Sequence, residues 1–434
     1  MRSWGALGAV FTAAVLVSSL SACAPGETEQ PAAADVVRVP ADAATITEAV
    51  DLVAPGGLVL IEPGVYAEQV LVDKEDVTIR GVDRNDTIID GEGVRSYGIV
   101  GIADGIRVEN LTVREATFYG VLVTGMHDEN GPTAHGGAGY TTLDPEKFPP
   151  VQRFAIDSVT ASNNGLYGIY AFDAQHGVIR NSYASGSADS GFYVGQCREC
   201  DILVEGNVAE RNAIGFENAN ASDSVYLVGN RFSGNRIGMT LISNYQEAFT
   251  PQRGNTVVGN VVVDNAGADS PSHADGGFGV GVGIAGGQEN LLRANVIAGN
   301  PAAGVLFSNT EDLAATGNTL ADILFDGNGV DVANVSAERA PASLNCVTGG
   351  AFSALPALFG TECAGTQPAD ARAALPAVTV PPGVSFLKVA APPRLPGLDA
   401  DDTIPSPLPA TIDVPDLDAV TLPSRDLLAD WTNS

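Results

Sequence analysis

A repeat of about 23 residues constrains the fold of this chain more than any other feature. Residues 204–216 read VEGNVAERNAIGF, and residues 227–239 read LVGNRFSGNRIGM. Glycines that precede an apolar segment recur at steps of 23, 24, 23, 43 and 23 residues: Gly168, Gly191, Gly215, Gly238, Gly281 and Gly304. The long step is one period plus an insertion. Because such a unit is too short for a β–α–β crossover, the repeat predicts short strands.

Apolar residues occupy fixed positions within each unit. The residue after each glycine is always apolar: Ile169, Phe192, Phe216, Met239, Val282 and Val305. A series of asparagines, each followed two residues later by an apolar side chain or alanine, runs through Asn181, Asn207, Asn230, Asn260, Asn295 and Asn318. The apolar residues of that second series are Tyr183, Ala209, Phe232, Val262, Ile297 and Leu320. This alternation predicts strands with one buried face.

A coil of stacked parallel strands satisfies these observations best. Each strand would pair with its copy one period away, about 4.8 Å along the axis. The asparagines would turn the corners, because asparagine tolerates left-handed backbone and its amide can bond to the next layer. The glycines would lie where a Cβ has no room. Neither the repeated asparagines nor the repeated glycines therefore need a catalytic or binding role.

The segment that precedes the repeats carries a family resemblance. It contains the helix-forming stretch TITEAV, Gly56-Gly57, Pro63-Gly64-x-Tyr66-x-Glu68 and Ile79-x-Gly81. With the later GN-x-x-x-x-N-x-x-G units, it resembles right-handed parallel β-helix proteins of the pectin-lyase-like superfamily over about residues 36–345. The resemblance implies an all-β, single-stranded, right-handed parallel β-helix. It implies no single activity, because the superfamily includes lyases, hydrolases, epimerases, esterases and non-catalytic binders.

Both ends of such a coil need a cover. Thr45-x-x-Glu48 before an apolar run is a capping box, and it predicts a short helix over 46–54 that covers the first layer and its exposed edge. We expect a monomer. At the other end, residues 341–367 could supply the cover, tied by a disulfide between Cys346 and Cys363. The domain would then span 36–367.

Residues 368–434 are rich in proline, which excludes helices and long strand ladders. They form either a disordered tail or an extended arm along the β-helix. Regularly spaced apolar residues favour partial docking, and the expected anchors are Val384, Phe386, Leu387, Leu395, Leu422 and Trp431.

The first 22 residues form an export signal, too short to span a membrane. Leu20-Ser21-Ala22-Cys23 resembles the lipobox of bacterial lipoproteins. The resemblance implies cleavage before Cys23, lipidation of its thiol and anchoring to the outer face of the bacterial cell membrane. The alternative is an ordinary secretory signal with a chance cysteine. Residues 23–35 would be a flexible tether.

The formal net charge of −30 argues against nucleic acid or anionic lipid surfaces as partners, because phosphates require lysine and arginine. Export permits disulfides. Cys197 and Cys200 form a CxxC motif without a following histidine or the strand-to-helix setting of a redox site. A turn disulfide or two packed thiols is the favoured interpretation.

Insertions interrupt the period at 126–153, 244–255 and 268–279. The first two follow the glycine-led strand, so they leave from the same corner. Candidate acid–base groups in the first are His127, His135, Lys147 and Arg153. Residues expected on the outer face between the insertions, where sugar rings could stack and hydroxyls could bond, are Tyr170, Tyr193, Glu217, Asp173, Gln196 and Asn220. Loop carboxylates such as Asp128, Glu129, Asp269 and Asp275 could hold Ca²⁺, although no EF-hand spacing is present.

Two functions fit these features. The first is a lipid-anchored protein that binds, and could cleave or epimerise, a polysaccharide. The second is a non-catalytic envelope or assembly factor, similar to the β-helix protein that helps load copper into nitrous-oxide reductase. Copper prefers methionine, histidine or cysteine ligands, and Met126, His127 and His135 are the candidates. The spacing of these residues selects no catalytic set. The sequence contains neither a DPHD-like run, of the kind found in mannuronan epimerases, nor a pair of aspartates like that of polygalacturonases.

Overall fold

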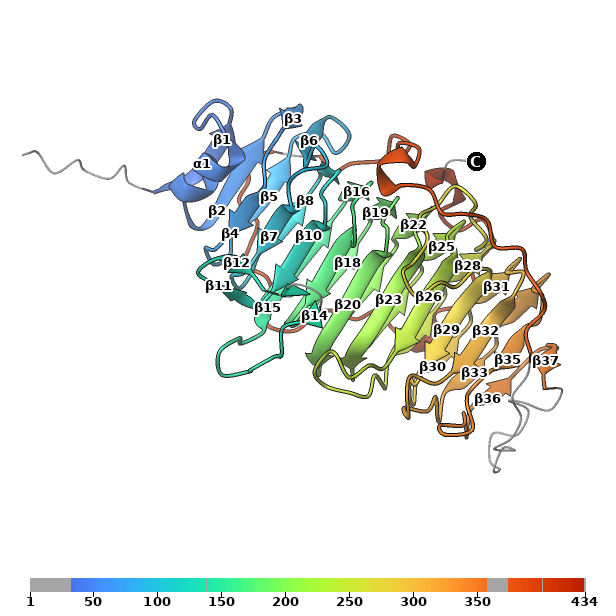
Figure 1. The fold of residues 1–434 in the computed structure, drawn as a ribbon. Helices are drawn as coiled ribbons and strands as arrows, with labels where there is room; N and C mark the ends of the chain where they lie inside the picture. Colours follow the sequence, from blue (N-terminus) through green and yellow to red (C-terminus); the bar gives the residue numbers. More distant parts are fainter. Residues whose placement is uncertain (1–32, 134, 137–138, 357–373, 400, 433–434) are drawn as a thin grey trace, which may run out of the picture. The chain divides into compact units, whose positions relative to one another are not determined.

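Three long parallel sheets, wound by one chain, form the body of the protein (Figure 1). The computed structural model describes residues 33–133, 135–136, 139–356, 374–399 and 401–432. They belong to one compact unit, Ala33–Ser434. The export segment, Cys23 and Cys363 lie outside the described residues. Among the described helices, none is long and apolar enough to span a membrane.

The chain passes from sheet A to sheet B to sheet C and back to A. Sheet A contains β1 (Ala34–Val39), β2 (Val53–Ile61), β5 (Thr78–Gly81), β8 (Arg107–Glu109), β15 (Val151–Asp157), β18 (Ala174–Arg180), β21 (Ile202–Glu205), β24 (Val225–Val228), β27 (Thr256–Val258), β30 (Leu291–Arg293), β33 (Thr319–Ala321) and β36 (Cys346–Thr348). Sheet B contains β3 (Gly64–Tyr66), β6 (Thr87–Asp90), β9 (Thr112–Arg114), β16 (Thr160–Ser162), β19 (Tyr183–Ser185), β22 (Val208–Glu210), β25 (Arg231–Ser233), β28 (Val261–Val263), β31 (Val296–Ala298) and β34 (Leu324–Asp326).

Sheet C contains the strands that follow the repeated glycines Gly168 to Gly304. It contains β4 (Val70–Val72), β7 (Tyr97–Gly101), β10 (Tyr119–Thr124), β17 (Ile169–Phe172), β20 (Ser190–Arg198), β23 (Ile214–Ser222), β26 (Ile237–Ile242), β29 (Val280–Ala285), β32 (Ala303–Ser308), β35 (Val332–Asn334) and β37 (Ala354–Leu355). Two small hairpins pair β11 (His127–Asp128) with β12 (Gly131–Pro132), and β13 (His135–Gly136) with β14 (Gly139–Tyr140).

The predicted stacking inside the coil is confirmed. Phe192 pairs with Phe216 and Phe216 with Met239 in parallel register, and all three side chains are completely buried. The same column continues through Ile169 at one end and Val305 at the other. A Cβ on Gly215 would lie 2.4 Å from the carbonyl oxygen of Gly238 in the next layer. The all-β parallel β-helix predicted from the repeat is therefore the observed fold.

The asparagine series needs a correction. A ladder at the corner between sheets A and B links Asn207, Asn230, Asn260 and Asn295 through side-chain amides. Asn318 lies instead at the corner between C and A, where its amide donates to Asn345. Asn181 lies outside the ladder and donates to Asp157, while Ser182 donates its N–H to Asn207. Three corners, rather than one, carry asparagines at similar spacings.

Because Asn181 and Asn318 lie outside the ladder, Tyr183 and Leu320 do not belong to the predicted core column of sheet B. Ala184, not Tyr183, pairs with Ala209, so Tyr183 lies on the outer side of sheet B. There it packs with Val208 and Leu395 of the proline-rich segment. Leu320 belongs to sheet A, where it pairs with Leu292.

Helix α1 (Ile46–Leu52) lies against β1, β2 and β4. Thr45 Oγ1 accepts a hydrogen bond from the N–H of Glu48, as the capping box predicts. The Glu48 carboxylate accepts from Ala44 rather than from Thr45. Glu68 accepts from the N–H groups of Ile46 and Thr47, and so satisfies two further donors of the first turn. The helix ends two residues before the predicted boundary because β2 begins at Val53.

Residues 374–399 and 401–432, including three short 3₁₀ helices, form an arm that lies on the outside of the coil (Figure 1). The helices are η1 (Phe386–Lys388), η2 (Leu417–Ala419) and η3 (Ala429–Trp431). Polar side chains of the coil hold the arm by its carbonyl groups. Asn163 donates to Phe386 and Val389, and Arg84 donates to Pro396 and lies 5.4 Å from the ring of Trp431. Because proline leaves its carbonyl free and fixes φ, this segment can dock extended without joining a sheet.

Cysteine pairing can be followed in part. Cys346 lies in β36, is buried and forms no disulfide with another described cysteine. Its predicted partner, Cys363, lies outside the described residues, so this pairing stays a prediction.

Candidate functional site

The outer face of sheet C is bordered by all three insertions. Residues 126–150 follow β10 and residues 244–255 follow β26, so both rise from the corner between sheets C and A, as predicted. Residues 268–279 lie between β28 and β29, and rise from the opposite corner between B and C. The strands between these walls are β17, β20 and β23.

The predicted outer column exists, but it is not an exposed strip. Tyr170, Tyr193 and Glu217 are partners in successive strands, as expected. Their exposed fractions are only 0, 1 and 7%. Met126 and Phe148 of the first insertion belong to the same apolar cluster as the two tyrosines. The prediction that these side chains present open stacking platforms is therefore wrong, because the insertions fold down onto them.

The second predicted row is also buried and holds the insertions in place. Gln196 donates to Met126 Sδ at 3.0 Å and accepts from the N–H of Ala248 at 2.9 Å, so it joins the first two insertions. Asn220 donates to the carbonyls of Asn244 and Glu247 within the second insertion. These residues have positive φ at the corner, as does Asp173. Their observed contacts are structural.

The candidate acid–base residues whose side chains the structure describes do not form one cluster. His127 lies in β11 and is partly exposed, and Lys147 is exposed with Nζ 4.5 Å from the ring of Phe148. Arg153 lies in sheet A, where it pairs with Asp76 at 2.7 Å. His135 lies in β13, and its side chain lies outside the described residues. Of the four, only His127 and Lys147 have described side chains that lie in the loop of the first insertion.

A groove of about 360 Å³ lies within the first insertion. We call it the insertion groove, and its lining residues are Asp128, Asn130, Gly131, Pro132, Thr133, Thr141, Lys147 and Phe148. It offers a carboxylate, an amide, two hydroxyls, an ammonium group and an aromatic ring. Its volume lies within the range of about 300–1,000 Å³ typical of ligand sites.

A smaller hollow of about 50 Å³ adjoins the insertion groove, with Phe148 lining both. Phe249 of the second insertion lies on its other side, with the guanidinium of Arg198 5.3 Å from the ring. Asp173 lines the hollow and is 2% exposed. Burial raises the pKa of Asp173 to about 7, because the charged form loses its water.

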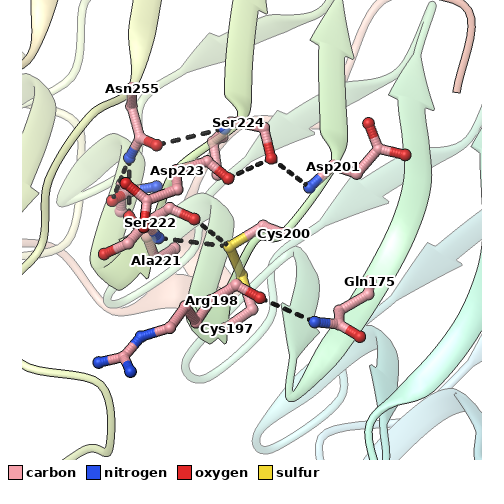
Figure 2. The surroundings of a disulfide bond; sticks show 12 residues. Gln175, Cys197, Arg198, Cys200, Asp201, Ala221, Ser222, Asp223, Ser224 and Asn255 are labelled. Carbon is pink, nitrogen blue, oxygen red and sulfur yellow. Dashed lines mark hydrogen bonds between the residues drawn. A yellow bond between two sulfur atoms is a disulfide. The ribbon is translucent and has the colours of Figure 1, made fainter. Parts of the chain in front are cut away.

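Figure 2 shows the disulfide between Cys197 and Cys200. Both cysteines belong to the main core of the coil, and Cys197 also lines this hollow. Both residues are buried, and Cys200 Sγ accepts from the N–H of Ser222 at 3.3 Å. Gln175 donates to the carbonyl of Arg198, within the closed turn. The interpretation as a turn disulfide is confirmed.

A chain of proton-carrying groups lies at the opposite edge of sheet C. Ser190 Oγ is 2.6 Å from Glu217 Oε2 and 3.0 Å from Asp189 Oδ1. His273 Nε2 is 3.4 Å from the same Asp189 oxygen, and its Nδ1 accepts from the N–H of Asp275. Burial raises the pKa of Glu217, and the charge of Asp189 raises it further. Since a hydroxyl has one proton, a protonated Glu217 can donate to Ser190 while Ser190 donates to Asp189.

Sequence reasoning named Glu217 but missed Asp189 and Ser190. Ser190 pairs with Ile214 one layer further along the coil, whereas His273 lies 83 residues after Ser190 in the sequence. No spacing connects the third insertion to Asp189, because that contact depends on how the insertion folds back.

Metal ligands are not grouped in the described part of the chain: no three histidine, cysteine, aspartate or glutamate side chains there could hold one ion. Asp269, a candidate Ca²⁺ ligand, pairs with Arg211 at 3.0 Å. Met126, a candidate copper ligand, is completely buried, and its sulfur accepts from Gln196.

Comparison with known proteins identifies the family. The family model described as "Right handed beta helix region" matches residues 75–262 and 150–320, which together cover more than half of the chain. A comparison with curated proteins finds no match.

Several solved structures are similar in outline. They include the A-module of mannuronan C-5 epimerase AlgE6 from Azotobacter vinelandii, with 17% identity, 71% of this chain and 90% of that chain covered, and a TM-score of 0.49. Pectate lyase Pel9A has 15% identity, with 74% and 76% covered and a TM-score of 0.37. The GH87 α-1,3-glucanase of Streptomyces thermodiastaticus has 13% identity, with 74% and 68% covered and a TM-score of 0.39. On the family match and the observed coil, the chain belongs to the right-handed β-helix family.

Proposed function

We propose that this protein binds an extended polysaccharide at the insertion groove. The observation that carries the proposal is the lining of the groove, where the polar groups of Asp128, Asn130, Thr133 and Thr141 gather beside Lys147. Phe148 also lines the groove but is only 3% exposed, so hydrogen bonds to sugar hydroxyls, rather than ring stacking, would hold the ligand. Lys147 adds one cation in a chain of net charge −30, which would favour an acidic sugar at this place.

The position of the acid–base groups favours binding over cleavage at the insertion groove. The groups arranged to pass a proton are Glu217, Ser190, Asp189 and His273, and they lie at the edge of sheet C next to sheet B. The insertion groove rises from the other edge, next to sheet A. A bound sugar in the groove would therefore not contact them.

A glycan array with the unit Ala33–Ser434 tests this function. Lys147→Ala should weaken binding of an acidic polysaccharide by at least about fivefold, as expected for the loss of one charge-assisted hydrogen bond. Lys388→Ala is the matched control, because Lys388 is an exposed lysine on the arm and should leave binding unchanged. Equal binding by wild type and Lys147→Ala, or no binding to any glycan, would reject the groove.

Cleavage is tested separately by the ultraviolet absorbance of unsaturated uronates. We expect no rise in absorbance when the same unit is mixed with pectate, alginate or glycosaminoglycans, because no described acid–base chain lies in the insertion groove. A rise that His127→Ala abolishes would instead assign a lyase activity to the first insertion.

We also propose that the chain is anchored by a lipid on Cys23 to the outer face of the bacterial cell membrane. The support is the stretch Leu20-Ser21-Ala22-Cys23 and the polar segment after it. Labelling cells with a radioactive fatty acid should label the wild type and not Cys23→Ser. Label in both proteins would contradict the anchor.

A further inference from the structure

A cavity of about 460 Å³ lies under the arm, between arm residues 408–415 and the outer face of sheet A. We call it the arm cavity. Two contacts fasten the arm above it. Arg107 donates to the carbonyl of Ser406 at 2.7 Å, and Ile412 donates its N–H to Asp201 at 3.1 Å. The arm thus closes this cavity over a part of sheet A that lies away from the insertion groove.

Charged side chains of both signs line the arm cavity. They are Arg107, Asp157, His176, Arg180, Glu205 and Asp413. An apolar row also belongs to the lining, because Ala155, Val178 and Leu203 pair in successive strands of sheet A. Such a lining suits a ligand that carries charged or amide groups together with small apolar groups.

Part of this charge is matched within the protein. Asp157 accepts from Arg180 at 2.7 Å, and His176 Nδ1 lies 2.9 Å from a carboxylate oxygen of Asp201.

The remaining charges belong to Arg107, Glu205 and Asp413, which form no ion pair with another described residue. Arg107 and Glu205 are partly buried, and Asp413 is exposed at the rim. Burial lowers the pKa of Arg107, although the charges of Glu109 and Asp157 act in the opposite direction. A ligand that brings one anionic and one cationic group would therefore complete the pairing.

The unmatched charges lie at opposite ends of the cavity. Arg107 lies in β8 and Glu205 in β21, which is three strands further along sheet A. At about 4.8 Å per strand, the two positions are about 14 Å apart along the axis. Asp413 lies at the end of Glu205, because the preceding residue, Ile412, is bound to Asp201 directly before β21. One end of the cavity is thus cationic and the other anionic.

We propose that the arm cavity binds a short zwitterionic peptide, with its terminal carboxylate on Arg107 and its terminal ammonium group between Glu205 and Asp413. An extended tripeptide is about 10 Å long, and the side chains of Arg107 and Glu205 cover the rest of the distance. Small side chains of the peptide would lie on Ala155 and Val178. A fatty acid lacks the ammonium group, and a neutral sugar lacks both charges. This site is independent of the insertion groove and of the polysaccharide.

Calorimetry with the unit Ala33–Ser434 tests the site, with trialanine as the probe. Two blocked peptides of the same length are the controls. N-acetyl-trialanine lacks the ammonium group, and trialanine amide lacks the carboxylate. Each should bind at least about tenfold more weakly than trialanine, as expected for the loss of a charge-assisted hydrogen bond. The proposal is overturned if trialanine does not bind, or if either blocked peptide binds equally well.

Two variants assign the ends of the ligand. Arg107→Gln should weaken trialanine binding at least about tenfold, and it should bind trialanine and its amide equally, because neither then meets a guanidinium. Glu205→Gln should instead reduce the preference for trialanine over N-acetyl-trialanine. If Arg107→Gln keeps the preference for the free carboxylate, the proposed orientation is wrong. The blocked peptides probe the unchanged protein, so their result decides the matter even where Arg107→Gln releases the arm from Ser406.

The matched control is Arg231→Gln. Arg231 is also partly buried under the arm, and its guanidinium donates to the carbonyls of Arg425 and Leu427. This variant should bind all three peptides like the wild type, and circular dichroism would show that the variants are folded. Equal losses of trialanine affinity in Arg107→Gln and Arg231→Gln would overturn the role of Arg107.

Discussion

Asn235→Ala is expected to lower the free energy of unfolding by about 3–5 kcal/mol, because it leaves several buried groups without partners at about 1–3 kcal/mol each. Asn235 is completely buried at the corner between sheets B and C. Its carbonyl accepts from the N–H and the amide of Asn212. Its amide donates to the carbonyl of Ala209 and to Asn265. Urea denaturation of the unit Ala33–Ser434 measures the loss.

The last residue of the same ladder supplies the control. Asn328 accepts from Asn300 and donates to Ile297 and Asp331, but it is only partly buried. Water can replace its bonds, so Asn328→Ala should cost less than half as much as Asn235→Ala. If both variants cost the same, or if Asn235→Ala costs less than about 1 kcal/mol, the ladders do not stabilise the coil as we infer.

The fold could be predicted from the sequence because the glycine column leaves little freedom. Each glycine of the repeat series, from Gly168 to Gly304, lies at the start of a strand at one edge of sheet C, and the next residue points inward. Asparagines were less informative. They turn all three corners, so that Asn318 could be mistaken for a member of the ladder that ends at Asn295.

The candidate site could be predicted only in outline. The breaks in the 23-residue repeat located the insertions. Because the first two both follow the strand that begins at a repeated glycine, the sequence also placed these two at the same corner. Alternation placed Tyr170, Tyr193 and Glu217 correctly on the outer side. It could not show that they are covered, because burial depends on where the insertions fold. Met126 accepts from Gln196, and Glu247 accepts from the hydroxyl of Tyr193, and neither contact has a fixed spacing in the sequence.

Asp173→Asn is expected to stabilise the protein at alkaline pH. Asp173 Oδ2 has no hydrogen-bond partner within the described structure. A Cβ on Gly125 would lie 2.0 Å from the carbonyl oxygen of Pro149 and 2.8 Å from Asp173 Oδ2, so these two oxygens are at most about 4.8 Å apart. A protonated acid or an amide could donate across this gap, whereas a carboxylate cannot. The backbone of Asp173 has φ +55°, which asparagine tolerates at least as well.

The sign of the pH effect follows from the raised pKa. Folded Asp173 has a pKa of about 7 against an ordinary value of 3.8, so the folded state binds the proton more tightly. Stability contributed by the protonated group is complete below about pH 4 and is lost as pH rises towards 7. The difference corresponds to about 4 kcal/mol. Asp173→Asn should therefore gain up to about 4 kcal/mol at pH 8 and almost nothing at pH 4, as measured by urea denaturation at both values.

Asp322→Asn separates this effect from backbone preference. Asp322 has φ +53° but is exposed, so its substitution should change stability by less than about 0.5 kcal/mol at either pH. An equal gain for Asp173→Asn at pH 4 and pH 8 would show that backbone preference, rather than a buried charge, is responsible. A loss at pH 8 would show that the carboxylate of Asp173 is needed by the hollow between Phe148 and Phe249. The expected result would mean that protonation of Asp173 stabilises the packing between the first and second insertions.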